Sequence, residues 1–550
     1  MTNARRHLSA LLLASTLAAC GSSSNEPPSS RDGATQGDAD SGADLLAADA
    51  AFEPPPGTQL LLPRGVLVGD GRNSCSSSGT GDTWCGVVVP AQTIGRYELW
   101  VFDATSVVTG EDLRCDGTDS YCLRLSRNAY GADPASVINY AFQGDTFFYR
   151  AGDDAGDAAA FNAPVWIWRP GWASGRELVA GSPSACEGQG DLDVAVCLRN
   201  VDDADGTWEE ITAGPTGTAE DGPLPVLDKV LLHSATTPPG VDVETQVGFS
   251  PDGADVAWSV GDATTGVQTL KVQKLGDATT RLTVATGVSY WRISNDGAAW
   301  LWLTSYTDDG IMPSGTLVTA PFPAGAGVST LAMDVAEYDL VGDKGMLFRA
   351  DVADQVGELR FMPDRAAPAT STLVDQGVRF TVARSADAST IVYSKTNTGV
   401  GADLFAWSAS LSAPCTLTEI PAANSSTALL MAGNAAVVWA QTDVKSQLLS
   451  GAVTALASCQ TKPFGSGLVS WASLGDDRLL YVDGAALGAA AGTLRVARVG
   501  ADGLTGAGIP LQQGVGVVLA PLPPNAVLYT LANGAASDGL YLYAGALLEP

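Results

Sequence analysis

Positive charge and histidine are scarce in this sequence of 550 residues. It carries 30 Lys and Arg against 60 Asp and Glu, and only two His. Because affinity for nucleic acid rests on clustered Lys and Arg, this balance argues against nucleic acid as a partner. Charged residues make up 16% of the chain, below the roughly 25% usual for soluble domains. The apolar share of 45% is ordinary, so the chain can bury a core and wholesale disorder is disfavoured.

The usual signatures of hydrolytic and metal sites are also missing. The sequence has no Gly-x-Ser-x-Gly motif and no CxxC pair. His7 lies in an N-terminal segment that we expect to be removed, and His233 lies in a predicted strand, so no nucleophilic triad and no zinc site is predicted. Hydrolysis by paired carboxylates stays open, because 60 acids offer many pairs whose convergence the sequence does not reveal.

The N-terminus has the composition of a secretory signal. Arg5 and Arg6 precede an apolar run over residues 8–17, which is too short to span a membrane. The following Leu17-Ala18-Ala19-Cys20 resembles the lipobox of bacterial lipoproteins. That resemblance implies that Cys20 carries a diacylglyceryl group and becomes the first residue after cleavage. The alternative is an ordinary cleaved signal with an incidental Cys.

Residues 20–58 are predicted to be the lipidated Cys and a solvated tether. The segment is rich in Ser, Asp, Ala, Gly and Pro and ends near Pro54-Pro55-Pro56. Gly21 and Ser22, rather than Asp, follow Cys20, and resemblance to Gram-negative lipoproteins then favours the outer membrane. No later stretch holds 18 uncharged apolar residues, so we expect the lipid to be the only membrane attachment.

Eight further Cys follow Cys20, and an even number in an exported chain predicts disulfides. Six of them form close couples that predict local staples, and zinc is the alternative weighed against them. Cys415 and Cys459 lie 22 and 20 residues after Tyr393 and Trp439, so they would bridge neighbouring repeat units if their Cα atoms lie within about 7 Å. The three close couples are Cys75 with Cys85, Cys115 with Cys122, and Cys186 with Cys197.

A repeat of about 45 residues fills the C-terminal 300 residues. Seven times, a turn rich in Gly, Asp, Asn or Ser leads into a short apolar strand with an aromatic residue at a matching place. The steps between these aromatics are 44, 46, 45, 46, 42 and 48 residues. Four short strands per 40 to 45 residues is the period of a β-propeller blade, and the aromatics are interpreted as packing between blades. They are Trp258, Trp302, Phe348, Tyr393, Trp439, Tyr481 and Tyr529.

The first unit, Phe249-Ser-Pro-Asp-Gly-Ala-Asp-Val-Ala-Trp258, resembles the repeat of TolB-type propellers. The resemblance covers roughly residues 245–550 and weakens after the first two units. It implies a propeller fold and an exported, protein-binding protein, and it carries over no catalytic residue. By the same resemblance Asp252, Gly253, Asp296 and Gly297 shape turns.

The fold predicted is all-β, with a propeller over residues 226–550 and a disulfide-stapled β-rich region over 59–225. That region is either a separate domain or a set of divergent blades. Seven blades are favoured, and eight or more stay open. The last unit lacks its outermost strand, and the run Lys229–Ser234 is predicted to supply it.

One acidic turn is a candidate calcium site. The segment Asn200–Gly206 and the nearby Glu209 partly match a calcium-loop pattern. The alternative is a solvated acidic turn. The proposed ligands are Asp202, Asp203, Asp205 and Glu209.

Together these features lead us to expect a lipid-anchored envelope propeller that binds a protein or glycan without catalysis. Calcium is the only cofactor under consideration. The alternative is a carboxylate- or calcium-dependent glycan hydrolase or lyase, and a third hypothesis is a purely structural surface protein.

Overall fold

In the computed structural model, the regular secondary structure of the described residues is nearly all β-strand. They span residues 56–548. The gaps are 64, 68–74, 78–81, 91–95, 109–121, 131–140, 152–163, 180, 182, 184, 190–191, 235–236, 238–244, 308–313, 354–355, 397–400, 422–425, 443–447, 485–490, 523–524, 532–537 and 546–547. Helices within this set are limited to α2 (Ala104–Val108), η4 (Ala278–Thr280) and η5 (Pro368–Thr370), and none of them could span a membrane.

The strands form eight antiparallel sheets in chain order. The first three are β2 (Val66–Leu67), β3 (Cys75–Ser77), β4 (Thr83–Pro90), β5 (Arg96–Asp103) and β6 (Cys122–Tyr130); then β7 (Ala141–Gln143), β8 (Thr146–Arg150), β9 (Val165–Trp168) and β10 (Arg176–Val179); then β11 (Ala185–Gln189), β12 (Val194–Asp203), β13 (Gly206–Pro215) and β14 (Val226–His233).

The next two sheets belong to the aromatic repeat. They are β15 (Gln246–Phe249), β16 (Asp255–Gly261), β17 (Gln268–Lys274) and β18 (Leu282–Thr286); then β19 (Val288–Ile293), β20 (Ala299–Thr307), β21 (Ser314–Pro321) and β22 (Ser329–Val335).

The last three sheets complete the chain. They are β23 (Glu337–Val341), β24 (Gly345–Ala353), β25 (Val356–Met362), β26 (Thr372–Arg384), β27 (Thr390–Thr396), β28 (Gly401–Ser408) and β29 (Cys415–Pro421); then β30 (Ser426–Met431), β31 (Ala436–Thr442), β32 (Leu448–Ala455) and β33 (Gln460–Ser466); then β34 (Ser470–Leu474), β35 (Arg478–Asp483), β36 (Gly492–Gly500), β37 (Gly503–Leu522), β38 (Ala526–Leu531) and β39 (Gly539–Ala544), joined by β1 (Thr58–Pro63).

Two sheets hold seven strands because one long strand serves two units. The first part of β26 pairs with β25 and its second part pairs with β27; β37 joins β36 and β38 in the same way. Five sheets make one four-stranded unit each, and the five-stranded sheet makes one unit in which β2 and β3 both pair with β4. The two seven-stranded sheets make two units each, so the described strands make ten units. The expected count of seven is not confirmed, because it left out the sheets before residue 245.

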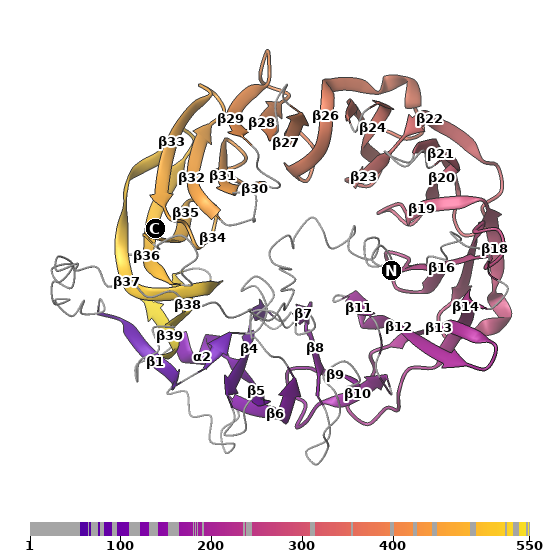
Figure 1. Cartoon of the computed structure of the whole chain (residues 1–550), viewed down its shortest axis with the longest axis horizontal. Coiled ribbons are helices and arrows are strands. Elements are labelled where there is room, and N and C mark those ends of the chain that lie inside the picture. Colours follow the sequence, from indigo (N-terminus) through magenta and orange to yellow (C-terminus); the bar gives the residue numbers. More distant parts are fainter. Residues whose placement is uncertain are drawn as a thin grey trace, which may run out of the picture.

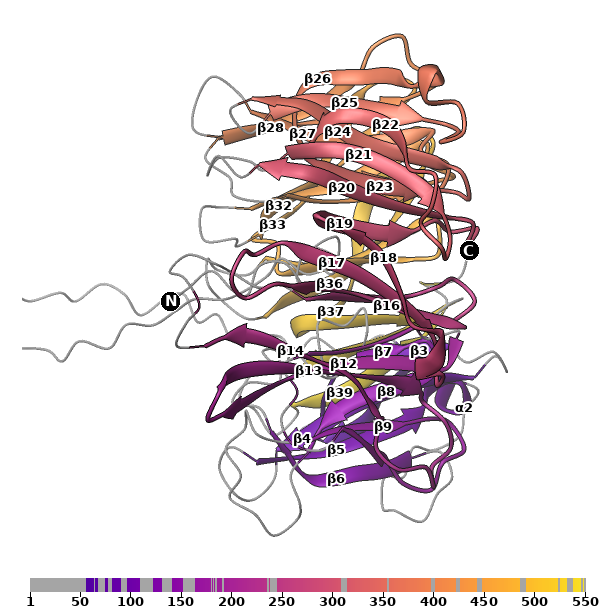
Figure 2. The ribbon, with the colours of Figure 1, turned by 90° about the vertical axis from the view of Figure 1, so that its right-hand side faces the viewer.

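The units stand side by side around a common axis, which makes the protein a β-propeller (Figure 1). The edge-on view shows the sheets stacked along the ring (Figure 2). Each core cluster joins two successive units: Val196 and Ile211 of one sheet pack with Trp258 of the next, for example. A blade buries its faces only against its neighbours, so the hydrophobic core is a series of such interfaces.

Burial follows this arrangement. The second strand of a unit has neighbours on both faces, and all six residues of β38 are accordingly buried, with Thr530 as the one polar residue among them. The outermost strand β18 has no buried residue. The repeated aromatics lie in the second strands, and all seven are at most 6% exposed. The interpretation of these side chains as packing between blades is confirmed.

The ring is closed by the N-terminal strand. β1 pairs with β39 as the outermost strand of the last unit, with Thr58 opposite Tyr543 and Pro63 opposite Gly539. The prediction that Lys229–Ser234 closes the ring was wrong: residues up to His233 belong to β14, which pairs with β13. Both runs are six residues long with three consecutive apolar residues, and only long-range pairing distinguishes them.

The strand register also shows at which end of the last unit β1 begins. Ala526, at the start of β38, pairs with Ala544 at the end of β39, and Thr58 lies beside that end of β39. The first residues of β1 are therefore at the same end of the unit as the turn that leads into β38.

Candidate functional site

The turns that join the first and second strands of successive units lie at one face of the ring. We call this the turn face and define it by the six turns described completely after residue 245. Neighbouring turns touch directly: the Asn295 amide donates to the carbonyl of Gly342 over 2.7 Å, and the N–H of Gly433 donates to Asp476 over 2.5 Å. The turns are 250–253, 294–297, 342–344, 385–388, 432–435 and 475–477.

The Asp-Gly sequence builds the first of these turns. The Ser250 hydroxyl donates to Asp252 Oδ1 over 2.6 Å, and the N–H of Ala254 donates to the same oxygen over 3.1 Å. Gly253 has φ +70°, a conformation that costs glycine little. The resemblance-based prediction that Asp252 and Gly253 shape a turn therefore agrees with the geometry. In the turn 294–297, Ser294, Asp296 and Ala298 make the same two bonds at 2.6 and 3.1 Å.

Two carboxylates of the turn face, those of Asp252 and Asp387, are held in their charged form. The Ser250 hydroxyl and the Ala254 N–H lower the pKa of Asp252. At Asp387, the N–H of Ser389 and the hydroxyls of Ser385 and Ser389 lower the pKa to about 2. Both side chains belong to exposed residues, so this face presents fixed negative charge at neutral pH.

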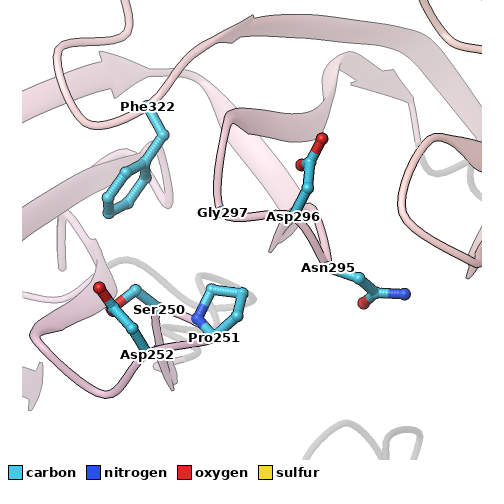
Figure 3. Close-up of a pocket in the computed structure, with 7 residues that line it drawn as sticks. All are labelled: Ser250, Pro251, Asp252, Asn295, Asp296, Gly297 and Phe322. Atoms are coloured by element: carbon cyan, nitrogen blue, oxygen red, sulfur yellow. The ribbon is translucent and has the colours of Figure 1, made fainter.

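A pocket of about 290 Å³ lies between the first two of these turns. Ser250, Pro251 and Asp252 form one wall, residues 295–297 form the other, and the ring of Phe322 points toward Ser250 and Asp252 (Figure 3). Phe322 follows β21, and its ring packs on Trp300 with 4.9 Å between centroids. A second pocket, of about 360 Å³, lies between residues 341–345 and Asp387.

The next groove along the ring is filled by an arginine of the chain itself. Arg365 Nη2 donates to both carboxylate oxygens of Asp296, over 2.7 and 2.6 Å, and Nη1 donates to the carbonyl of Asp343 over 2.5 Å. Burial raises the pKa of Asp296, but the bonds from Ser294, Arg365 and Ala298 outweigh it and the pKa is lowered. Arg365 therefore neutralises the acid of this turn.

The proposed calcium ligands lie along one hairpin and do not come together as a metal-binding group. Asp203 Oδ1 accepts the N–H groups of Asp205 and Gly206 and the indole N–H of Trp208. Asp202 accepts from Thr207. By strand alternation, Asp202 and Glu209 are on the opposite face of the hairpin from Asp203. Across the described residues no three His, Cys, Asp or Glu side chains form a group that could hold a metal ion.

Two of the predicted local staples are confirmed. Cys75–Cys85 and Cys186–Cys197 each join directly opposite residues of a hairpin. Cys415–Cys459 also forms, with 5.4 Å between Cα atoms, and joins the outer edges of two neighbouring units as the spacing predicted. Cys122 is disulfide-bonded, whereas Cys115 lies outside the described residues.

His233 ends strand β14 and is exposed, as an ordinary strand residue would be. Leu17, Ala18, Ala19 and Cys20 lie outside the described residues, so the lipobox stays a prediction. The sequence reading missed Arg365 and Phe322, because both lie in loops after third strands where no motif marks them.

Comparison of the sequence with known families and curated proteins finds no match. No protein-family model matches the chain, and no curated protein matches it.

Several solved structures are similar in fold at low identity. A crystal structure of a eukaryotic initiation factor matches 76% of this chain and 94% of its own, with 11% identity and a TM-score of 0.45. TolB from Acinetobacter baumannii matches 58% and 80%, with 13% identity and a TM-score of 0.25. The β-propeller domain of the Trilobed protease from Pyrococcus furiosus matches 58% and 95%, with 10% identity and a TM-score of 0.29. TM-scores this low support no argument about the activity of this protein.

Proposed function

We propose that this protein is a lipid-anchored lipoprotein of the cell envelope whose propeller binds a protein or glycan partner through the turn face, without catalysis. The observation that carries the proposal is the row of turns with fixed, ionised carboxylates and two open pockets between them. Such a surface offers rigid hydrogen-bond acceptors in a defined spacing, which is what specific recognition requires.

The anchor is supported by the sequence alone. The signal, the Leu17-Ala18-Ala19-Cys20 lipobox and the tether that ends where β1 begins form one continuous arrangement. Gly21 and Ser22 favour the outer membrane of a Gram-negative bacterium. We expect metabolic labelling with a radioactive fatty acid to mark the wild-type chain and to leave Cys20→Ser unlabelled. Equal labelling of both would refute lipidation at Cys20.

Partner binding can be tested by affinity capture from detergent-solubilised envelope. The bait is the mature chain from residue 20 with Cys20→Ser, because a bait starting at residue 59 would cut into β1. The comparison bait carries Asp252→Asn and Asp387→Asn, which remove two charges of the turn face and preserve side-chain size. A saturable partner held by the first bait and lost from the second is the expected result.

The same bait separates binding from catalysis. A partner retained equally by both baits would place the interaction elsewhere on the ring. Turnover of an envelope glycan by the purified chain, abolished by substitution of acidic residues, would overturn the non-catalytic proposal. Capture and turnover are measured with calcium and with a chelator, so that a calcium requirement is detected in either assay.

A further inference from the structure

Two successive turns of the turn face have the same internal geometry. In each, a serine hydroxyl lies 2.6 Å from Oδ1 of the aspartate and a backbone N–H lies 3.1 Å from it. Gly253 and Gly297 have φ of +70° and +66°. Asp252 and Asp296 are therefore equivalent carboxylates presented in the same way.

These equivalent carboxylates differ in what covers them. Asp296 is covered by the guanidinium of Arg365, whose side chain is only 11% exposed. The N–H of Arg365 donates to the carbonyl of Lys344, the residue before β24. In the preceding unit, the N–H that makes the equivalent bond, to the carbonyl of Ala298 before β20, belongs to Phe322, which carries no charge.

The groove at Asp252 is accordingly open. Ser250 and Ala254 bond to Oδ1 of Asp252, and none of the residues that line the pocket is a lysine or arginine. The pKa of Asp252 is lowered by these hydrogen bonds and not by a cation. What remains is the pocket of about 290 Å³, with Phe322 beside the carboxylate (Figure 3).

We propose that this pocket, the Asp252 pocket, binds the guanidinium of an arginine side chain on a partner polypeptide. Arg365 on Asp296 shows within the same molecule that a guanidinium fits this type of groove. A planar guanidinium can pair with both oxygens of a carboxylate and stack on an aromatic ring, which selects arginine over lysine. The formal charge of −30 attracts such a cationic partner. The inference rests on the proposed binding function and assigns its partner to arginine-bearing polypeptides.

The pocket can be tested without knowing the partner. The probes are N-acetylarginine amide, N-acetyllysine amide and the uncharged N-acetylcitrulline amide, titrated into the mature Cys20→Ser chain by NMR. We expect saturable shifts with the arginine probe, weaker binding of the lysine probe and none of the citrulline probe. Loss of one charge-assisted pair should lower affinity by about tenfold or more in Asp252→Asn.

Two variants use the difference between the grooves. Phe322→Arg places a guanidinium where Arg365 stands in the next unit, and it should block the arginine probe. Arg365→Ala should uncover Asp296 and raise the number of bound probe molecules from one to two. The matched control is Asp262→Asn, because Asp262 also caps a turn through Thr264 and Thr265 but lies in the hairpin between second and third strands, at the other face.

The outcomes separate this inference from the proposed function. No saturable arginine binding, or binding unchanged in both Asp252→Asn and Phe322→Arg, overturns the Asp252 pocket even where affinity capture yields a partner. Arginine binding that follows the expected pattern supports the Asp252 pocket even where affinity capture yields no partner. In that case the proposed function fails and the pocket does not.

Discussion

Asp387 shows how single hydroxyl groups set the charge of the turn face. Its carboxylate accepts the N–H of Ser389 over 3.0 Å and the hydroxyls of Ser385 and Ser389 over 2.7 and 2.8 Å. These donors favour the charged form and lower the pKa to about 2. No cation is involved, so the charge is fixed by the turn itself.

Replacing Ser385 and Ser389 with alanine should raise the pKa of Asp387 from about 2 toward the ordinary 3.8. Because the pKa is lowered on folding, this carboxylate stabilises the fold above about pH 4, and its contribution is lost as the pH falls through about 2. An NMR titration of the Asp387 side chain, in wild type and in the double variant, measures the shift. Identical titration curves in wild type and variant would show that the two serine side chains do not lower the pKa of Asp387.

At the scale of strands and loops, the bridge between Cys415 and Cys459 differs from the hairpin staples. It closes a loop of 44 residues, whereas Cys75–Cys85 closes one of 10. In the chain-entropy model the stabilisation grows with loop length. The longer bridge also holds two separate units together, so its loss affects an interface and not one hairpin.

We therefore expect Cys415→Ser with Cys459→Ser to lower the free energy of unfolding by up to about 4 kcal/mol, against up to about 3 kcal/mol for Cys75→Ser with Cys85→Ser. Urea unfolding under oxidising conditions measures both. A larger loss of unfolding free energy from the hairpin pair would indicate that native packing, and not loop length, dominates the stabilisation by these disulfides.

The repeat made much of the strand arrangement predictable from the sequence. The aromatic at every 42 to 48 residues and the Asp-Gly turns identified the blades after residue 245, because local packing and turn chemistry are encoded nearby. The closing strand was not predictable in this way. Thr58–Pro63 and Lys229–Ser234 each hold three consecutive apolar residues, yet the first pairs with β39 at the far end of the chain and the second with the neighbouring β13.

At the scale of the whole molecule, ring closure depends on β1. The last and first units share a core in which Leu61 packs with Trp100, Phe102 and Leu542. Removing β1 would expose the edge of β39 and uncover part of this core. A propeller without its closing strand should therefore lose cooperativity at this seam first.

A chain starting at residue 64 should unfold at a lower temperature than one starting at residue 56, and protease should cut it first near β39. Thermal unfolding and limited proteolysis with mass spectrometry test this. The chain from residue 56 is the control, since both lack the tether. Equal melting temperatures would show that closure does not need β1.

The candidate site depends on this same long-range order. Arg365 reaches Asp296 across 69 residues of sequence, and Phe322 reaches the turn of the preceding unit. Neither contact leaves a local pattern. Asp252 could be recognised from its motif, whereas the lack of a cation beside it depends on Phe322 standing where the next unit has an arginine.

The orientation of β1 also has a mechanical consequence. Thr58 is at the turn-face end of the strand, and the tether leads directly into it. Hydrogen bonds in an antiparallel ladder run perpendicular to the strands. A force that draws the tether outward from the turn face therefore pulls β1 along its own axis and shears all its bonds to β39 together, instead of peeling them apart one by one.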